Sequence, residues 1–176
     1  MSNKVRDIIY IGIFAVLISI CAWITVPTAV PFTLQSMGVF TAVGLLGGKR
    51  GSLAVVTYIL LGMIGLPVFS GFSGGIGVIL NATGGYIIGF LLSALVMWGL
   101  EKFLPRKMLA ISMIVGLIVC YIMGTTWFMA VYMQKMGGIS LSAVLGICVV
   151  PFVIPDLIKI LLSVLLVNRL KKTMKG

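Results

Sequence analysis

The sequence predicts an all-α integral membrane protein in which six transmembrane helices form one bundle and both chain ends face the cytoplasm. Three observations support this fold class. The 176 residues are 61% apolar and only 9% charged, whereas soluble domains carry about 45–50% apolar and about 25% charged residues. The apolar residues occur in long runs, and the basic residues gather in alternate connections between these runs. A mean hydropathy of +1.26 leaves too little polar surface for a water-soluble enzyme.

The chain length limits the architecture to a single transmembrane domain over residues 1–176. A helix needs about 20 residues to cross roughly 30 Å of hydrocarbon, so the chain can hold at most about six or seven crossings. Residues 1–6 are too short for the start of a cleaved signal peptide, and no cleavage motif follows the first apolar run. That run is therefore expected to remain as a membrane span.

Charged residues and Gly/Pro clusters separate the apolar runs from one another. The first five predicted spans are residues 8–24, 32–47, 53–67, 84–100 and 108–134. Residues 140–170 are too long for one straight crossing and contain Pro151 and Pro155. Because proline lacks a backbone donor and fits best in the first turn of a helix, we expect a short helix or loop over residues 141–150. The last spanning helix is then expected to start near Pro155.

The distribution of lysine and arginine predicts the orientation. Eleven of these residues fall on one side of the predicted spans: Lys4, Arg6, Lys49, Arg50, Lys102, Arg106, Lys107, Arg169, Lys171, Lys172 and Lys175. The opposite side holds only Lys135, and Lys159 lies within an apolar run. Since cytoplasmic loops carry the excess of basic residues, both termini are expected in the cytoplasm. Short basic clusters between apolar runs indicate membrane topology rather than a nucleic-acid partner.

The connections on the non-cytoplasmic side predict a small-molecule pocket. Residues 30–35, 65–75, 81–86 and 151–159 contain glycines, aromatic residues and neutral hydrogen-bonding groups, but almost no charge. Irregular backbone at membrane depth is tolerated where protein buries it or where it lines a cavity, and such residues are typical of ligand pockets. The alternative is that these are merely tightly packed Gly-rich connections, but their occurrence on one face favours a pocket.

Asp156 and Lys159 are charges embedded in apolar sequence. A charge at the centre of a membrane helix costs about 2.5–3.5 kcal/mol on insertion scales, and such residues commonly have a function. Their i, i+3 spacing places them on one helix face, and Asp156 is expected in the first helical turn, where the dipole favours a carboxylate. The pair can accept an N–H and donate to an oxygen of one ligand. The alternative is a structural ion pair that holds the last helix.

The sequence indicates that the protein is not itself an enzyme and has no catalytic residues, metal ligands or cofactor. It contains no histidine and only three carboxylates, which excludes metal hydrolysis, Ser-His-Asp chemistry and carboxylate-pair chemistry. The segment GLLGGK at 44–49 lacks the spacing and the Ser or Thr of a phosphate-binding loop. Cys21, Cys120 and Cys148 match no metal spacing and are interpreted as small apolar residues.

Small residues recur along one side of the first predicted helix at Gly12, Ala15, Ser19 and Ala22. Such a small-residue stripe lets another helix approach closely. Two interpretations remain open, namely packing inside the protein's own bundle and docking of a partner subunit.

Four motifs, in this order, resemble the BioY family: PFTLQ at 31–35, GLPVFSGFSGG at 65–75, NATGGYIIGF at 81–90 and PFVIPDLIK at 151–159. BioY proteins are the biotin-specific substrate-binding (S) components of energy-coupling factor (ECF) vitamin transporters. The resemblance runs from about residue 5 to residue 172. One departure is that the family usually has GPTGGY where this chain has NATGGY, so contacts at Asn81 are expected to differ in detail.

The resemblance implies a six-helix bundle in a prokaryotic plasma membrane that binds biotin near its outer face. It also implies partners: a transmembrane coupling (T) subunit, which would dock on the small-residue stripe, and two ABC-type ATPases. Asp156 would accept from ureido N–H groups, and Lys159 would donate to a ureido or carboxylate oxygen. Further site residues would be Thr33, Gln35, Asn81, Thr83, Gly84 and Tyr86, with Phe69 and Phe72 as apolar wall.

Two other functions remain open at this stage. A proton-coupled secondary transporter of a small organic molecule could use Asp156 as its proton site. A purely structural membrane subunit would bind no small molecule.

Overall fold

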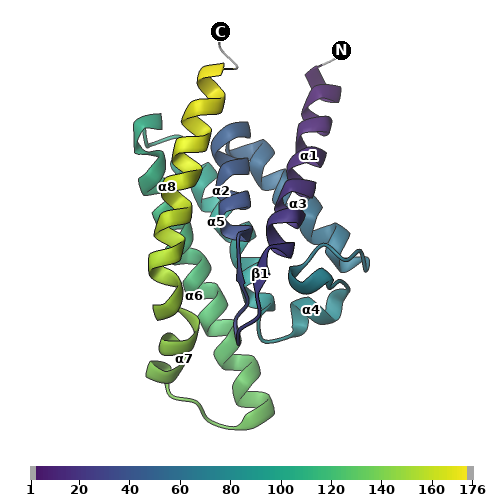
Figure 1. The fold of residues 1–176 in the computed structure, drawn as a ribbon, viewed down its shortest axis with the longest axis vertical. Coiled ribbons are helices and arrows are strands. Elements are labelled where there is room, and N and C mark those ends of the chain that lie inside the picture. The colour runs from purple at the N-terminus through teal and green to yellow at the C-terminus, as the bar shows by residue number, and fades with distance from the viewer. Residues whose placement is uncertain (1–2, 174–176) are drawn as a thin grey trace.

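The computed structural model describes residues 3–173 and is almost entirely helical. Met1, Ser2 and residues 174–176 lie outside the described residues, and with them Lys175 of the charge count. The longer helices are α1 (Asn3–Trp23), α2 (Gln35–Leu46), α3 (Gly48–Met63), α5 (Gly84–Leu100), α6 (Leu109–Met136) and α8 (Val150–Thr173) (Figure 1). The short elements are α4 (Ile76–Leu80), α7 (Leu141–Cys148), the 3-10 turns η1 (Ser70–Phe72) and η2 (Arg106–Met108), and the strands β1 (Thr25–Val26) and β2 (Phe32–Thr33).

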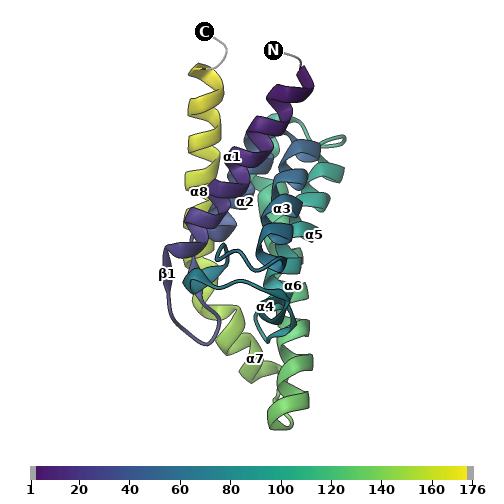
Figure 2. The same ribbon diagram turned by 90° about the vertical axis from the view of Figure 1, so that its right-hand side faces the viewer.

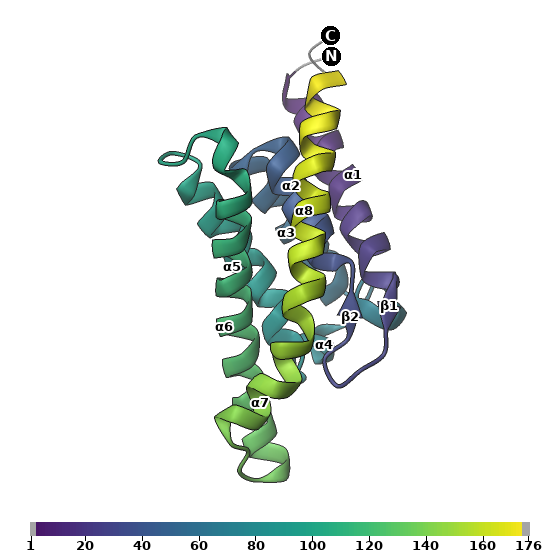
Figure 3. The ribbon, with the colours of Figure 1, turned by 60° about the vertical axis from the view of Figure 1, so that its left-hand side comes forward.

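The long helices run roughly along one axis and form a single bundle. The first turns of α1 and the last turns of α8 lie at the same end of it, and α7 lies at the opposite end together with the end of α6 (Figures 1 and 3). Helix α5 packs along α6, α8 packs on α2, and α1 packs on α2 and α3. The antiparallel hairpin of β1 and β2 and the short helix α4 lie beside the half of the bundle that is remote from the termini (Figure 2).

Three helical segments are long and apolar enough to cross a membrane within residues 3–173: Lys4–Trp23, Arg106–Gln134 and Leu141–Lys172. Helices α2 and α5 are shorter apolar helices, and the 12 residues of α2 extend only about 18 Å. Outward-facing isoleucine and leucine side chains such as Ile8, Ile122 and Leu161 are exposed, as expected where lipid rather than water is the neighbour. An all-helical membrane fold is therefore supported.

The predicted span 84–100 coincides with α5, and the spans 32–47 and 108–134 agree with α2 and α6 to within three residues. Helices α1 and α3 each begin five residues earlier than the predicted spans 8–24 and 53–67. The start of the last helix was predicted wrongly, since α8 begins at Val150 and includes Pro151 and Pro155. Pro151 is the second residue of α8, where no intrahelical donor is needed. Pro155 removes one helical hydrogen bond, a loss that membrane helices tolerate. Asp156 consequently lies in the second turn, so the predicted dipole stabilisation at the helix start does not apply.

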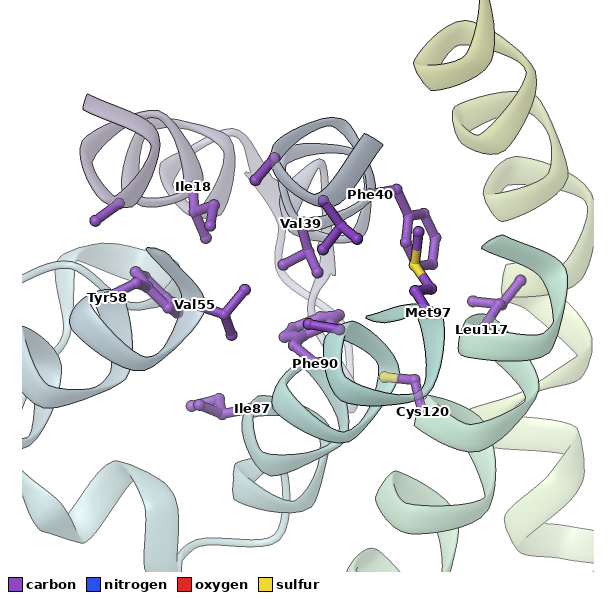
Figure 4. Close-up of a cluster of buried hydrophobic side chains, with 14 of the residues drawn as sticks. Ile18, Val39, Phe40, Val55, Tyr58, Ile87, Phe90, Met97, Leu117 and Cys120 are labelled. Atoms are coloured by element: carbon purple, nitrogen blue, oxygen red, sulfur yellow. The ribbon is translucent and has the colours of Figure 1, made fainter. Parts of the chain in front are cut away.

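The core of the bundle is formed by apolar side chains from α1, α2, α3, α5 and α6 (Figure 4). The burial of the small-residue stripe on α1 distinguishes between its two interpretations. Ala15, Ser19 and Ala22 are buried, and α1 packs here against α2 and α3. Only Gly12 of the stripe is exposed. Of the two interpretations, the structure supports packing within the protein's own bundle for Ala15, Ser19 and Ala22, because α2 and α3 already cover them.

Helices α5 and α6 approach each other closely through glycines, and this contact positions two aromatic side chains. A Cβ at Gly124 would lie 2.3 Å from the Tyr86 ring, and one at Gly85 would lie 2.2 Å from the Trp127 side chain. Small residues at such crossings let helix backbones approach. The tyrosine of α5 is thereby held against α6, at the level where the bundle opens into a cavity.

Candidate ligand-binding site

A cavity of about 450 Å³ lies in the half of the bundle that is remote from the termini. Its walls come from the starts of α2 and α5, the middle of α6, the end of α7 and the first half of α8, with η1, α4 and the hairpin completing them. The volume is within the range of roughly 300–1,000 Å³ that is typical of small-molecule sites. Sequence segments far apart in the chain therefore converge on one site.

Asp156 and Lys159 form an ion pair in the wall of this cavity. The Lys159 Nζ atom lies 2.8 Å from Asp156 Oδ1, and the side chains are 6% and 8% exposed for Lys159 and Asp156. Nζ also donates to the backbone carbonyl of Thr33 at 2.6 Å and lies 4.1 Å from the centroid of the Phe32 ring. Because buried charges are costly unless they are paired and hydrogen-bonded, these contacts explain how both remain inside the bundle.

Two further side chains, neither assigned to the site from sequence, bind the Asp156 carboxylate. Ser36 of α2 donates to Oδ1 at 3.1 Å, and Tyr121 of α6 donates to Oδ2 at 2.5 Å. Ser36 directly follows Gln35 of the PFTLQ motif, which is a weak signal for it. Tyr121 stands in a long apolar run, and nothing local indicates which way it faces.

Gln35 is fixed in the cavity wall by a buried tyrosine of α3. Its Nε2 donates to the Tyr58 hydroxyl at 2.5 Å, and its backbone N–H donates to Thr33 Oγ1 at 3.2 Å. The Tyr58 ring packs edge-on against Phe69 with 5.5 Å between centroids. A buried side-chain amide held in this way has a defined orientation toward a ligand.

The segment before α5 contributes Asn81, Thr83 and Tyr86 to the wall. Asn81 Oδ1 accepts from the N–H of Ala82 at 2.9 Å, so this side chain is already partly engaged. The Tyr86 hydroxyl donates to the Cys148 carbonyl at 3.2 Å, which ties α5 to the end of α7. These residues line the cavity with neutral hydrogen-bonding groups.

Two of the residues assigned to the site from sequence lie outside the cavity wall. Phe72 is 64% exposed and stacks on Trp23 with 5.0 Å between ring centroids. The positive φ of Phe72, 55°, belongs to the irregular η1 turn, which carries the ring outward. Gly84 does not line the cavity either, because its Cα faces the backbone of α4, where a Cβ would lie 1.7 Å from the Ile79 carbonyl oxygen. The other eight assigned residues line the cavity.

The arrangement is suited to a ligand whose polar edge carries an N–H beside a carbonyl oxygen. Asp156 supplies an acceptor, Lys159 supplies a donor, and the two lie within 2.8 Å of each other. Apolar side chains, including Val30, Ile87 and Phe152, form much of the remaining wall. A mainly apolar ligand with one amide-like edge would satisfy both kinds of surface.

Comparison with known proteins identifies the family. A model of the BioY family matches residues 1–176. The chain is 42% identical over 169 residues to the biotin transporter BioY of Thermotoga maritima, with 95% of this chain and 96% of that protein covered. It is 37% identical over 169 residues to a probable biotin transporter BioY of Pyrococcus horikoshii, with 96% and 98% covered.

A solved structure with a similar fold is that of the S-component for biotin from an ECF-type ABC transporter. Its TM-score is 0.85 at 31% sequence identity, and the match covers 98% of this chain and 95% of that one. The resemblance noted in the four sequence motifs is thus confirmed over the full length. From the family match and these relatives, we conclude that the chain belongs to the BioY family.

Proposed function

We propose that this chain is the biotin-binding S component of an ECF-type ABC uptake transporter in a prokaryotic plasma membrane. The observation that carries the proposal is the buried Asp156–Lys159 pair in the wall of a mainly apolar cavity, in a chain whose relatives are named biotin transporters. The protein acts in transport and is not an enzyme.

The chemistry of biotin matches the wall of the cavity. Its ureido group carries N–H donors beside a carbonyl acceptor, which suits Asp156 Oδ2 and the ammonium of Lys159. Its thioether ring is apolar and suits the aromatic and aliphatic wall, including Phe69. The neutral groups of Gln35 and Asn81 would hydrogen-bond the remaining polar atoms.

In this proposal the chain captures biotin at the outer face and releases it inward together with partner subunits. A transmembrane coupling (T) subunit and two ABC ATPases would supply the energy of ATP hydrolysis. Six crossings, with both termini in the cytoplasm, would place the cavity in the outer half of the membrane, because the cavity lies remote from the ends of α1 and α8.

The proposal is tested by identifying the ligand that co-purifies with the protein in detergent. Mass spectrometry is expected to detect co-purified biotin, and titration of biotin into the stripped protein should show saturable binding. Well-folded protein that neither retains nor binds biotin would contradict the proposal and favour a purely structural subunit. If cells that lack the ATPase partners still take up biotin, and an uncoupler abolishes this uptake, the protein would instead be a proton-coupled transporter.

The proposed topology is tested by cysteine labelling. Single cysteines at Lys49 and Gln134, both exposed positions, are introduced after the three native cysteines have been replaced. In intact cells a membrane-impermeant maleimide is expected to label position 134 and not position 49, since the basic loops remain in the cytoplasm. Labelling of position 49 in intact cells would overturn this orientation, and labelling of both positions after lysis is the control.

A further inference from the structure

Tyr121 lines the cavity, and its hydroxyl is hydrogen-bonded to Asp156. The hydroxyl donates to Asp156 Oδ2 at 2.5 Å, while Ser36 and Lys159 donate to the other oxygen, Oδ1, at 3.1 and 2.8 Å. A carboxylate has about four acceptor positions, two on each oxygen. Three are occupied in this arrangement, so a single position remains, on Oδ2.

We propose that Tyr121 is a positioning residue that holds the Asp156 carboxylate so that this last acceptor position is presented to the ligand. The inference rests on the proposed biotin-binding function and deepens it. Tyr121 would act through Asp156 rather than by contacting the ligand itself. Asp156 would then accept one ligand N–H, and the second ureido N–H of biotin would be bound by another group of the wall.

The contacts around Asp156 explain why the carboxylate needs this support. The ammonium of Lys159 lies 2.8 Å from Oδ1 and attracts both carboxylate oxygens. Ser36 also binds Oδ1, so within residues 3–173 only the Tyr121 hydroxyl restrains Oδ2 from the opposite side. Without that hydroxyl, the carboxylate can rotate about its Cβ–Cγ bond until both oxygens face the Lys159 ammonium, so that the remaining acceptor position no longer points to the ligand.

The first test is Tyr121→Phe, which removes the hydroxyl and keeps the ring. The dissociation constant for biotin is expected to rise about tenfold, the effect of losing one hydrogen bond to a charged group. Tyr132→Phe is the matched control, because Tyr132 is on the same helix, stacks on Phe128 and does not line the cavity. The control should bind biotin like the unmodified protein.

The second test separates positioning from direct ligand contact by a double-mutant cycle with Asp156→Asn. If Tyr121 acts through the carboxylate, adding Tyr121→Phe to Asp156→Asn should change the dissociation constant by less than about twofold. An equal loss of about tenfold in both backgrounds would mean that Tyr121 binds the ligand independently, and would overturn the proposal.

Two other outcomes would also overturn it. Unchanged affinity of the Tyr121→Phe protein, while the unmodified protein binds biotin, would show that the hydroxyl is not needed. A Tyr121→Phe protein that no longer folds, judged by gel filtration and thermal unfolding, would make the hydroxyl a structural group. Absence of biotin binding by the unmodified protein would instead refute the proposed function, so the two failures are distinguishable.

Discussion

Asp156→Asn is expected to raise the dissociation constant for biotin roughly ten- to hundredfold, because a hydrogen bond to a charged group contributes about 1.5–3 kcal/mol. The substitution keeps the shape of the side chain but replaces one acceptor oxygen by a donor amide, which would face the ligand N–H or the Tyr121 hydroxyl. It also leaves Lys159, whose side chain is 6% exposed, without its opposite charge. Lys159→Met should weaken binding likewise, since it removes a donor and leaves the carboxylate unpaired.

The measurement is titration of biotin into purified, monodisperse protein, together with its thermal unfolding. The matched control is Asp7→Asn, which removes the carboxylate of another ion pair, with Arg50 at 3.1 Å. That pair is more exposed and joins the first turns of α1, which hold Asp7, to the start of α3, which holds Arg50. Neither residue lines the cavity, so affinity should not change. If the Asp156→Asn protein unfolds at lower temperature but binds biotin normally, the pair is structural and Asp156 does not belong to the binding site.

Gly84→Ala is expected to have the largest effect on stability. The added Cβ would lie 1.7 Å from the Ile79 carbonyl oxygen and 2.7 Å from the Ile79 Cα. Since both atoms belong to the backbone, no side-chain rotation relieves the contact and the connection between α4 and α5 must move. Overpacking of this kind costs about 1–3 kcal/mol or more. Because Asn81 and Thr83 of this connection line the cavity, biotin affinity should fall as well.

Gly99→Ala is the matched control on the same helix. A Cβ at Gly99 would meet no atom within 4 Å, and alanine favours the interior of a helix over glycine by about 0.5–1 kcal/mol. The melting temperature in detergent should therefore fall for Gly84→Ala and stay level or rise for Gly99→Ala. A Gly84→Ala protein with normal stability but weakened biotin binding would indicate that Gly84 contacts the ligand, as the sequence motif predicted.

Local sequence was sufficient for several features of this protein. Apolar run length and the flanking breakers located the helices, and the predicted span 84–100 coincides with α5. The i, i+3 spacing of Asp156 and Lys159 brought the two charges together on one helix face, and the observed ion pair agrees with it. The four motifs identified the family. The helix positions and the charge pair depend on residues close together in the chain, where helix geometry alone relates them.

Tertiary structure decided the partners of those residues. Tyr121 and Ser36 are 35 and 120 residues from Asp156 in the sequence, and only the packing of α2 and α6 against α8 brings them to its carboxylate. Helix packing also buried Ala15, Ser19 and Ala22 of the small-residue stripe, and the η1 turn directed Phe72 away from the cavity. The physical reason is that lipid and protein core are both apolar. Apolar patterning therefore does not reveal which face of a membrane helix points inward.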